Sequence, residues 1–431
     1  MQMTDTTAAP PAAVTQDKAP ASSWYALAIL TLIYSCHFLD RSMISIIVEP
    51  VRKEFMLNDS QLGLLTGLAY GATFALAGIP LGLMVDRVSR VRLLAVLVAI
   101  WSGMTALSAY ATSFVYLLLA RMGVGAAEAG GSPTSLSLIS DLFPPNKRST
   151  AVGCFFLSNA FGATASIFIG GYVTAQYGWR TAMLVAGVPG LILAVVLFLT
   201  VKEPRRGGTD AVPTSTKAAG LGEVMRFFVA NRAMLHLVLG TAILTAAIAT
   251  IGAWLPSFGM RFHDLTIKQA GLAAAVAGGF CGAIGSVMGG ILSDRLGKSN
   301  PRRRLDLCTA ICCLAVVLAL GGMMSGSTAV SMTLLSLTMM FGFFCYPAAF
   351  GTMLGLAESN MRGMAAASLQ IATNLLGYGL GPYMVGLLSD FIGGAGSLRP
   401  AMSIVMAVCF PWAALHFWLA ARATARLNAK L

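Results

Sequence analysis

The sequence predicts an all-α integral membrane protein with twelve transmembrane helices in two pseudo-symmetric bundles of six. Three observations support this prediction: an apolar composition, a series of long apolar segments and an internal repeat. Hydrophobic residues make up 57% of the 431 residues and charged residues only 11%, a balance that is not typical of soluble globular chains. The chain is therefore expected to fold in a bilayer.

The apolar segments predict the transmembrane helices one by one. A helix needs about 20 mostly apolar residues to cross roughly 30 Å of hydrocarbon. Segments of this kind recur along the whole chain. In order, the twelve expected spans are residues 24–49, 60–85, 92–110, 114–141, 149–174, 181–201, 232–258, 268–293, 305–323, 328–355, 363–390 and 400–420.

Polar segments divide this series into parts. Residues 1–23 are rich in Ala, Pro, Thr and Ser and lack the features of a signal peptide, so we expect a disordered cytoplasmic N-terminus. A polar stretch rich in Gly and Pro follows the sixth span and predicts a cytoplasmic linker at 202–231. The N-terminal bundle is then 24–201, the C-terminal bundle 232–420 and the cytoplasmic tail 421–431.

The two halves of the chain repeat each other. GLMVDRVSR at 82–90 aligns with GILSDRLGK at 290–298 at an offset of 208, and both follow the second span of their half. The fifth spans align at an offset of 215, which pairs Asn159 with Asn374 and Gly171 with Gly386. Two independent echoes at similar offsets indicate the duplication of a six-helix unit.

The basic residues predict the orientation. With the N-terminus inside, 21 of the 29 Lys and Arg residues fall on the cytoplasmic side and 6 on the opposite side. Only Arg41 and Arg121 remain within spans. The net charge of +12 then reflects topology and anionic lipid headgroups, not nucleic-acid binding. We expect a multi-pass protein of the bacterial inner membrane with both termini cytoplasmic.

Four charges are expected near the middle of the membrane. At 1.5 Å per residue, Asp40 lies about 15 Å from the end of the first span, and Arg121 and Glu128 lie about 10 and 21 Å deep in the fourth. A charge at this depth costs at least about 2.5–3.5 kcal/mol, so it usually faces a wet cavity and a partner. We expect Asp40 and Glu128 to carry protons, and Arg41 and Arg121 to switch partners or bind a substrate head group. The alternative is a static cluster that locks two helices together.

Other polar or aromatic residues in the spans are candidates for lining a substrate cavity. His37 lies one turn before Asp40 and could share its proton. The repeat places two asparagines at equivalent positions. For each candidate the alternative is a hydrogen bond to a neighbouring helix. The set is His37, Asn159, Trp254, Asn374 and Tyr378.

The repeated loops predict a cytoplasmic gate. Asp86 and Asp294 lie at helix ends, where a carboxylate can meet the positive end of a neighbouring helix, while Arg87 and Arg295 can bind carboxylates or headgroups. The alternative is that these residues only anchor the topology. The gate candidates are Gly82, Asp86, Arg87, Arg90, Gly290, Asp294, Arg295 and Lys298.

No motif indicates catalysis or a metal site. A phosphate loop ending in LGKS at 296–299 would need glycine at 292, where leucine stands. No HExxH, zinc-ligand spacing or nucleophile motif occurs, and all eight cysteines fall within expected spans. We expect no enzyme activity, no catalytic residues, no metal and no cofactor, with protons as the coupling ion.

From about residue 24 onward the chain resembles the major facilitator superfamily, because both halves carry the loop Gly-x-x-x-Asp-Arg. Four further segments resemble the spinster-like branch of that superfamily. They are FLDRSMISIIVEPVRKEF at 38–55, RMGVGAAEAGGSPTSLSLISDLFPPNKRSTA at 121–151, GAWLPSF at 252–258 and LLGYGLGPYMVGLLSD at 375–390. The resemblance implies the major facilitator fold and a sphingolipid-like or lysophospholipid cargo, with proton coupling.

Together these observations predict a monomeric secondary active transporter that works by alternating access around a midplane site. Its partners would be protons, membrane lipids and a small amphiphilic or lipid-like substrate such as a lysolipid or sphingoid, and no nucleic acid. One alternative is a proton-coupled transporter of a small organic anion or drug. Alternatives of another class are a non-transporting lipid receptor and an intramembrane lipid-modifying enzyme.

Overall fold

The structure is a computed structural model that describes residues 20–85, 87–206, 226, 230–299, 302–357 and 362–428. In these ranges every regular element is a helix, which confirms the predicted all-α fold. Ten stretches of the described chain are long and apolar enough to span a membrane. One of them, Thr150–Thr200, covers two of the expected spans, and a third expected span is divided into two short helices. The count of twelve therefore stays a prediction.

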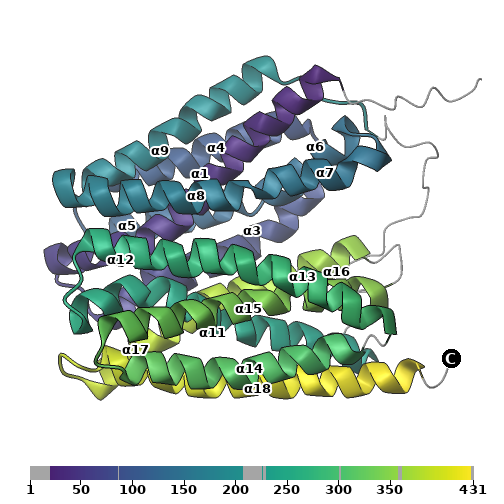
Figure 1. Cartoon of the computed structure of the whole chain (residues 1–431). Helices are drawn as coiled ribbons and strands as arrows, with labels where there is room; N and C mark the ends of the chain where they lie inside the picture. Colours follow the sequence, from purple (N-terminus) through teal and green to yellow (C-terminus); the bar gives the residue numbers. More distant parts are fainter. Residues whose placement is uncertain are drawn as a thin grey trace, which may run out of the picture.

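The N-terminal half forms the upper group of helices in Figure 1. Its elements are α1 (Ala21–Phe55), α2 (Asp59–Gly63), η1 (Leu64–Leu68), α3 (Ala69–Val85), α4 (Arg90–Leu107), η2 (Ser108–Tyr110), α5 (Phe114–Glu128), α6 (Gly131–Leu142), α7 (Pro145–Phe156), α8 (Ser158–Ser166), η3 (Ile167–Val173) and α9 (Thr174–Thr200).

The C-terminal half forms the lower group. Its elements are α11 (Arg232–Phe262), α12 (Ile267–Ala274), η4 (Ala275–Cys281), α13 (Gly282–Ser299), α14 (Arg302–Met324), α15 (Thr328–Leu356), α16 (Arg362–Ala372), η5 (Thr373–Leu380), α17 (Gly381–Ile392) and α18 (Leu398–Asn428). The segments η1, η3, η4 and η5 are π-helical turns within longer helices. Such turns often mark functional regions.

The two halves have the same helix caps and helix-ending glycines at equivalent positions. Asn58 and Gln61 form a capping box before α2, and Thr266 and Gln269 form the same box before α12, 208 positions later. Gly178 has a φ of 82° and Gly393 a φ of 73°, and they interrupt or end corresponding helices 215 positions apart. Only glycine adopts these angles without strain. The local structure therefore follows both sequence repeats.

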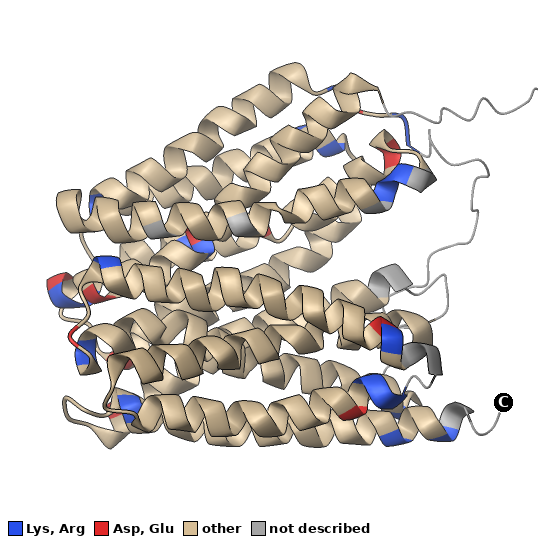
Figure 2. Ribbon diagram, viewed as in Figure 1, with Lys and Arg blue, Asp and Glu red and all other residues tan. Residues whose placement is uncertain are grey.

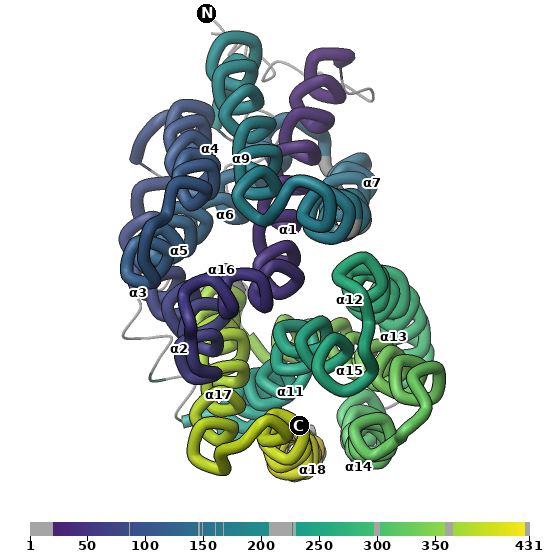
Figure 3. Tube along the Cα trace, turned by 90° about the vertical axis from the view of Figure 1, so that its left-hand side faces the viewer, coloured from purple at the N-terminus to yellow at the C-terminus, as the bar shows by residue number. Residues whose placement is uncertain are grey.

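The two halves lie side by side, and the described chain ends at residues 20 and 428 fall at the same end of the helices (Figure 1). We call this the proximal end and the opposite one the distal end. Figure 3, viewed from the distal end, shows α2 of one half beside α17 of the other. Further contacts between the halves join α1 to α11, α3 to η5 and α12 to η3.

The apolar cores differ between the two ends. One continuous core includes Ile47, Val51 and Leu65 of the N-terminal half together with Trp254 and Phe258 of the C-terminal half. A second core, which includes residues of α4, α6 and α7, lies within the N-terminal half alone. The halves therefore share a core toward the distal end, and the proximal part of the N-terminal half packs separately.

A line of glycines allows the halves to touch backbone to backbone. A Cβ added to Gly63 would lie 2.7 Å from the carbonyl oxygen of Pro382, and one added to Gly67 would lie 2.7 Å from that of Gly379. A Cβ at Gly71 would lie 2.6 Å from the carbonyl oxygen of Asn374. Because these glycines are spaced by four residues, they share one helix face. We call the contact of Gly63, Gly67 and Gly71 with η5 and α17 the glycine seam.

The surface is consistent with a membrane protein. Charged residues gather at the two ends of the helices, with a small group between them (Figure 2). Large apolar side chains such as Leu76, Ile192 and Val287 are exposed along the helices. Exposed apolar surface of this kind is typical of a membrane-facing protein.

Candidate functional site

A cavity of about 660 Å³ lies between the two halves. Its polar lining includes Arg41, Tyr70 and Glu128 from the N-terminal half and Asn374 and Tyr378 from the C-terminal half. The rest of the lining is mainly apolar and includes Ile248, Phe156, Phe343 and Phe350. The cavity thus combines a small charged region with a larger apolar surface.

The predicted mid-membrane charges gather at this cavity. Asp40, Arg121 and Glu128 are 2%, 4% and 2% exposed, and Arg41 is half-buried. Arg41, Arg121 and Glu128 line the cavity, while Asp40 lies behind the lining. The helices α1 and α5 therefore bring together charges that are 80 or more positions apart in the chain.

Glu128 accepts two hydrogen bonds on one oxygen. Its Oε2 lies 2.7 Å from the hydroxyl of Tyr70, which donates, and 3.0 Å from Nδ1 of His37. Its Oε1 has no hydrogen-bond partner among the described residues. A carboxylate held in this way can take a proton on the open oxygen without losing its existing partners.

Asp40 has a similar arrangement. Its Oδ2 accepts a hydrogen bond of 3.1 Å from Thr105 on α4, and its Oδ1 has no partner among the described residues. In the described part of the chain, no nitrogen of Arg41 or Arg121 comes within 4.0 Å of a carboxylate oxygen. The acids are thus held by neutral groups and a histidine, and not by a static network of arginine ion pairs.

Arg41 is held by aromatic rings and an amide. Its guanidinium carbon lies 3.6 Å from the centre of the Tyr378 ring and 5.2 Å from that of Tyr70. One of its terminal nitrogens donates to Oδ1 of Asn374 at 3.3 Å. Because cation–π contacts leave the charge of the guanidinium uncompensated, Arg41 can still bind an anion from the cavity.

The remaining cavity candidates divide into two groups. His37, Asn159, Asn374 and Tyr378 all line the cavity. Trp254 does not line it: the side chain is 1% exposed, and its Nε1 donates to the carbonyl oxygen of Pro382 at 3.0 Å. In this structure the indole therefore joins two helices, and a place for Trp254 in the substrate cavity stays a prediction.

Within the described chain, none of the predicted gate residues forms a hydrogen bond or ion pair with the other half. Asp86 lies outside the described residues, as does the side chain of Lys298. Arg87 and Arg295 are exposed, and Asp294 is only 4.0 Å from Arg304 of its own half. The candidates Gly82 and Gly290 have no close neighbour that a Cβ would displace.

Arg90 has a well-defined role within the N-terminal half. It is 1% exposed and donates to Asp141 at 2.5 Å and to Glu203 at 2.8 Å. Burial raises the pKa of the Glu203 carboxyl, but hydrogen bonds from Val91, Arg90 and Ser89 outweigh burial and hold the pKa below its usual range. Glu203 therefore adds stability that is present above its unfolded-state pKa and is lost as the pH falls through the folded-state pKa.

Replacing Arg90 with alanine is expected to destabilise the N-terminal half by about 3 kcal/mol, because it removes the buried cation that pairs with both Asp141 and Glu203. Thermal unfolding should show a lower midpoint than in the wild type. Arg92→Ala is the matched control, since Arg92 is the neighbouring exposed arginine. Equal midpoints for the two variants would contradict the assignment.

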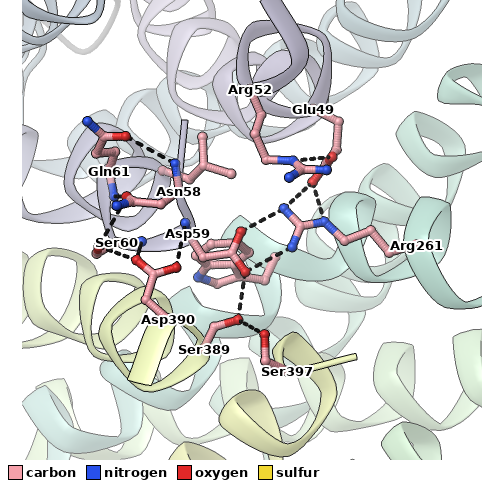
Figure 4. Close-up of polar contacts among 12 residues, drawn as sticks. Glu49, Arg52, Asn58, Asp59, Ser60, Gln61, Arg261, Ser389, Asp390 and Ser397 are labelled. Carbon is pink, nitrogen blue, oxygen red and sulfur yellow. Dashed lines mark hydrogen bonds and ion pairs between the residues drawn. The ribbon is translucent and has the colours of Figure 1, made fainter. Parts of the chain in front are cut away.

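A second polar cluster, at the distal end, was not foreseen from the sequence (Figure 4). Arg261 of α11 donates to Oε1 of Glu49 at 2.7 Å and to both oxygens of Asp59 at 2.8 and 2.9 Å. Glu49 and Asp59 are 4% and 7% exposed. One arginine of the C-terminal half therefore binds two buried acids of the N-terminal half.

Residues of α17 complete this cluster. Asp390 accepts hydrogen bonds from the backbone N–H of Asp59 at 3.0 Å and of Ser60 at 2.8 Å, and also from the Ser60 hydroxyl. Ser389 donates to Asp59 at 2.6 Å. The acid thus caps the start of α2 from the other half of the protein. We call Glu49, Asp59, Arg261, Ser389 and Asp390 the distal cluster.

The cavity extends away from the distal cluster. Its lining reaches Phe350 and Ala366, which lie toward the proximal ends of α15 and α16. On the other side it stops at Ile46 and Ala253, before the distal ends of α1 and α11. The distal cluster and the glycine seam therefore hold the halves together on the distal side of the cavity.

Comparison with known proteins places these features in context. Residues 30–382 match the family model described as Major Facilitator Superfamily. The structure is similar to a crystal structure of a bacterial homolog to the human lysosomal transporter Spinster, in its inward-facing and unoccupied conformation. The TM-score is 0.84 with 26% sequence identity, over 95% of this chain and 99% of that one.

Relatives differ in what their names say they transport. The chain is 26% identical to an MFS-type efflux pump of Mycolicibacterium smegmatis over 96% of both chains. It is 24% identical to a hexuronate transporter of Bacillus subtilis over 83% of this chain and 86% of that one. It is 25% identical to the sphingosine-1-phosphate transporter SPNS2 of Danio rerio, over 85% of this chain and 76% of that one.

Proposed function

Because the chain belongs to the Major Facilitator Superfamily and is a spinster-like transporter and not an enzyme, we propose that it moves an amphiphile with an anionic head in exchange or in company with protons. The mechanism is alternating access. The cavity between the halves is the binding site. The chain acts as a monomer in the bacterial inner membrane, with both termini in the cytoplasm.

The observation that carries the proposal is the setting of Arg41. This cation lines an otherwise largely apolar cavity, and in the described chain it has aromatic and amide partners but no carboxylate within ion-pair distance. An anionic head group supplies a negative charge to pair with Arg41, while Phe156, Phe343 and Phe350 offer apolar surface for a tail. The name of the Danio rerio relative, a transporter of a phosphorylated sphingoid, supports this class of substrate.

The acids beside Arg41 supply the proton sites. Glu128 and Asp40 each keep one oxygen without a hydrogen-bond partner in the described structure, and both lie in the half that holds Arg41. A buried acid of this kind within a membrane protein is commonly part of a proton or substrate pathway. Glu128 lines the cavity directly, so protonation and substrate binding take place in one connected space.

The conformation fits one stage of the transport cycle. The distal cluster and the glycine seam join the halves on one side, and the cavity extends toward the other. With the predicted orientation, the distal end faces the outside and the cavity faces the cytoplasm. Separation of the distal contacts then opens the cavity to the outside.

Lysolipid movement tests the proposal. Purified protein is reconstituted in vesicles with fluorescent lysophosphatidylglycerol, and the leaflet that holds the label is read by chemical quenching from outside. A gradient of one pH unit supplies 1.36 kcal/mol per proton and can sustain about a tenfold enrichment. We expect enrichment that collapses when a protonophore removes the gradient and is absent from protein-free vesicles. Binding of the lysolipid without any movement would indicate a receptor and contradict the proposal.

A second candidate substrate is a small organic anion. Arg41 and Asn374 suit a carboxylate without a tail as well as a lipid head, and one relative is named as a hexuronate transporter. Radiolabelled glucuronate tested in the same vesicles separates the two candidates. Uptake of glucuronate with no movement of lysolipid would favour the second candidate and leave the apolar surface of the cavity unused.

A further inference from the structure

Tyr70 contacts the acid and both arginines of the site. The side chain lies at the start of α3 and is 2% exposed. Its hydroxyl donates to Glu128 at 2.7 Å, and its ring centre lies 5.2 Å from the guanidinium of Arg41 and 5.4 Å from that of Arg121. Both arginines are within cation–π range of this one ring. Tyr70 is therefore the residue that joins the proton site to the anion site.

The backbone at Tyr70 is fixed against α5. A Cβ on Gly125 would lie 2.6 Å from the carbonyl oxygen of Tyr70 and 3.1 Å from its Cα, so α3 and α5 meet at this point without intervening side chains. The hydroxyl of Thr73 also lies 3.1 Å from the Tyr70 carbonyl oxygen, to which it donates. A change in how Glu128 of α5 holds the Tyr70 hydroxyl thus acts on a tightly packed part of α3.

The next residue on α3 contacts the other half of the protein. A Cβ on Gly71 would lie 2.6 Å from the carbonyl oxygen of Asn374 and 2.8 Å from Cα of Gly379. The side chain of Asn374 in turn accepts the hydrogen bond from Arg41. Two consecutive residues of α3 therefore contact the acid in one half and the glycine seam with the other half.

We propose that Tyr70 is a positioning residue that links the protonation of Glu128 to the contact between the halves. This inference rests on the proposed function and deepens it. Hydrogen bonds to an ionised carboxylate are roughly twice as strong as those to a neutral one. When Glu128 is ionised, it holds the Tyr70 hydroxyl and keeps α3 in place at Gly71; when Glu128 is neutral, this hold weakens and the seam separates more readily.

Several charged or titratable groups surround this pair, and each belongs to an element packed against it. Tyr34, His37, Asp40 and Arg41 are on α1, Arg121 is on α5 and Tyr378 is on η5. The inference concerns Tyr70 because its side chain contacts Glu128 and its neighbour Gly71 forms part of the glycine seam.

The test compares Tyr70→Phe with Tyr346→Phe. Tyr346 lines the same cavity and donates to Thr245 at 2.8 Å, so the second variant removes a hydroxyl that does not reach Glu128. Exchange of fluorescent lysophosphatidylglycerol is measured at equal pH on both sides, then over a series of pH values, and enrichment is measured under a pH gradient. For Tyr70→Phe we expect near-normal exchange, at least a fivefold loss of driven enrichment and a flatter pH profile. Tyr346→Phe should keep the wild-type ratio of driven enrichment to exchange and the wild-type shape of the pH profile.

The outcomes separate this inference from the function on which it rests. A wild type that gives no driven enrichment would overturn the proposed function and this inference with it. A wild type that enriches lysolipid, with Tyr70→Phe equal to it, would overturn the inference alone. An equal fall in the ratio of driven enrichment to exchange in the two tyrosine variants would also overturn it, because loss of any cavity hydroxyl would then suffice.

Glu128→Asp provides a second variant if Tyr70→Phe does not fold. The shorter acid can still ionise but is withdrawn from the Tyr70 hydroxyl. We expect the same loss of driven enrichment with exchange retained. Normal enrichment in Glu128→Asp would overturn the inference.

Discussion

Replacing Arg261 with alanine is expected to move the protein from the distal-closed toward the distal-open state. The substitution removes the arginine that binds both Glu49 and Asp59 within the described chain. It leaves these buried acids with Arg52 and Ser389 as side-chain partners. Breaking a buried ion pair in this way costs about 3–5 kcal/mol. Because opening exposes both acids to water, the cost applies mainly to the closed state, and a shift of this size changes the ratio of states by at least about a hundredfold.

Spin-label distances across the distal end measure this shift. Met56 and Met324 are 87% and 77% exposed and lie in different halves, so both suit labelling in a background without native cysteines. We expect a longer main distance in Arg261→Ala than in the wild type. Arg180→Ala is the matched control, because Arg180 pairs with Glu54 at the same end but within one half. A distance distribution for Arg261→Ala that matches the control would contradict the role of the distal cluster.

The second large effect is expected from Glu128→Gln and Asp40→Asn. Each amide resembles the protonated acid in shape but cannot release a proton, so the cycle loses the step that links the pH gradient to transport. We expect each variant to lose the enrichment of about tenfold per pH unit that one coupled proton can sustain. Exchange at equal pH should continue, since the anion site at Arg41 remains.

The control for these two variants is Asp306→Asn. Asp306 is a half-buried acid that pairs with Arg302 one turn away on α14. This variant should enrich lysolipid as the wild type does. Full enrichment in both Glu128→Gln and Asp40→Asn would reduce the buried acids to a structural role.

The sequence predicted the helical fold because each span carries its own signal in about 20 apolar residues. The repeat was also visible in the sequence, because it is a local pattern that recurs at fixed offsets. The structure follows the same two offsets in the pairs Asn58 with Thr266 and Gly178 with Gly393. Depth along a helix was also enough to group Asp40 with Glu128, since the rise per residue is constant.

Tertiary contacts account for what the sequence did not predict. Tyr70 looked like one aromatic residue in an apolar segment, and its link to Glu128 arises from the close packing of α3 on α5. Arg261 and Asp59 lie at the ends of separate spans, where a single charge is ordinary. Only the arrangement of the two halves shows that they form one cluster. Three acids near expected outer helix ends, Glu49, Asp59 and Asp390, were the available signal.

The contacts of Arg90 are also tertiary contacts that the sequence did not predict. The repeat made its loop a gate candidate, and that role stays a prediction. The partners of Arg90 in the structure, Asp141 and Glu203, come from α6 and from the segment after α9. Nothing in the local sequence predicts those contacts. The arginine therefore stabilises the N-terminal half in this structure, where a gate between halves had been expected.

Proton exchange on ligand binding tests the central claim most directly, because that claim assigns coupling to Glu128 beside the anion site. The detergent-purified protein is mixed with lysophosphatidylglycerol in weakly buffered solution that contains a pH indicator. We expect a release or uptake of protons that saturates with the ligand in the wild type and is lost in Glu128→Gln, although the variant still binds. A proton signal of equal size in Glu128→Gln, or saturable binding to the wild type with no proton signal, would contradict it.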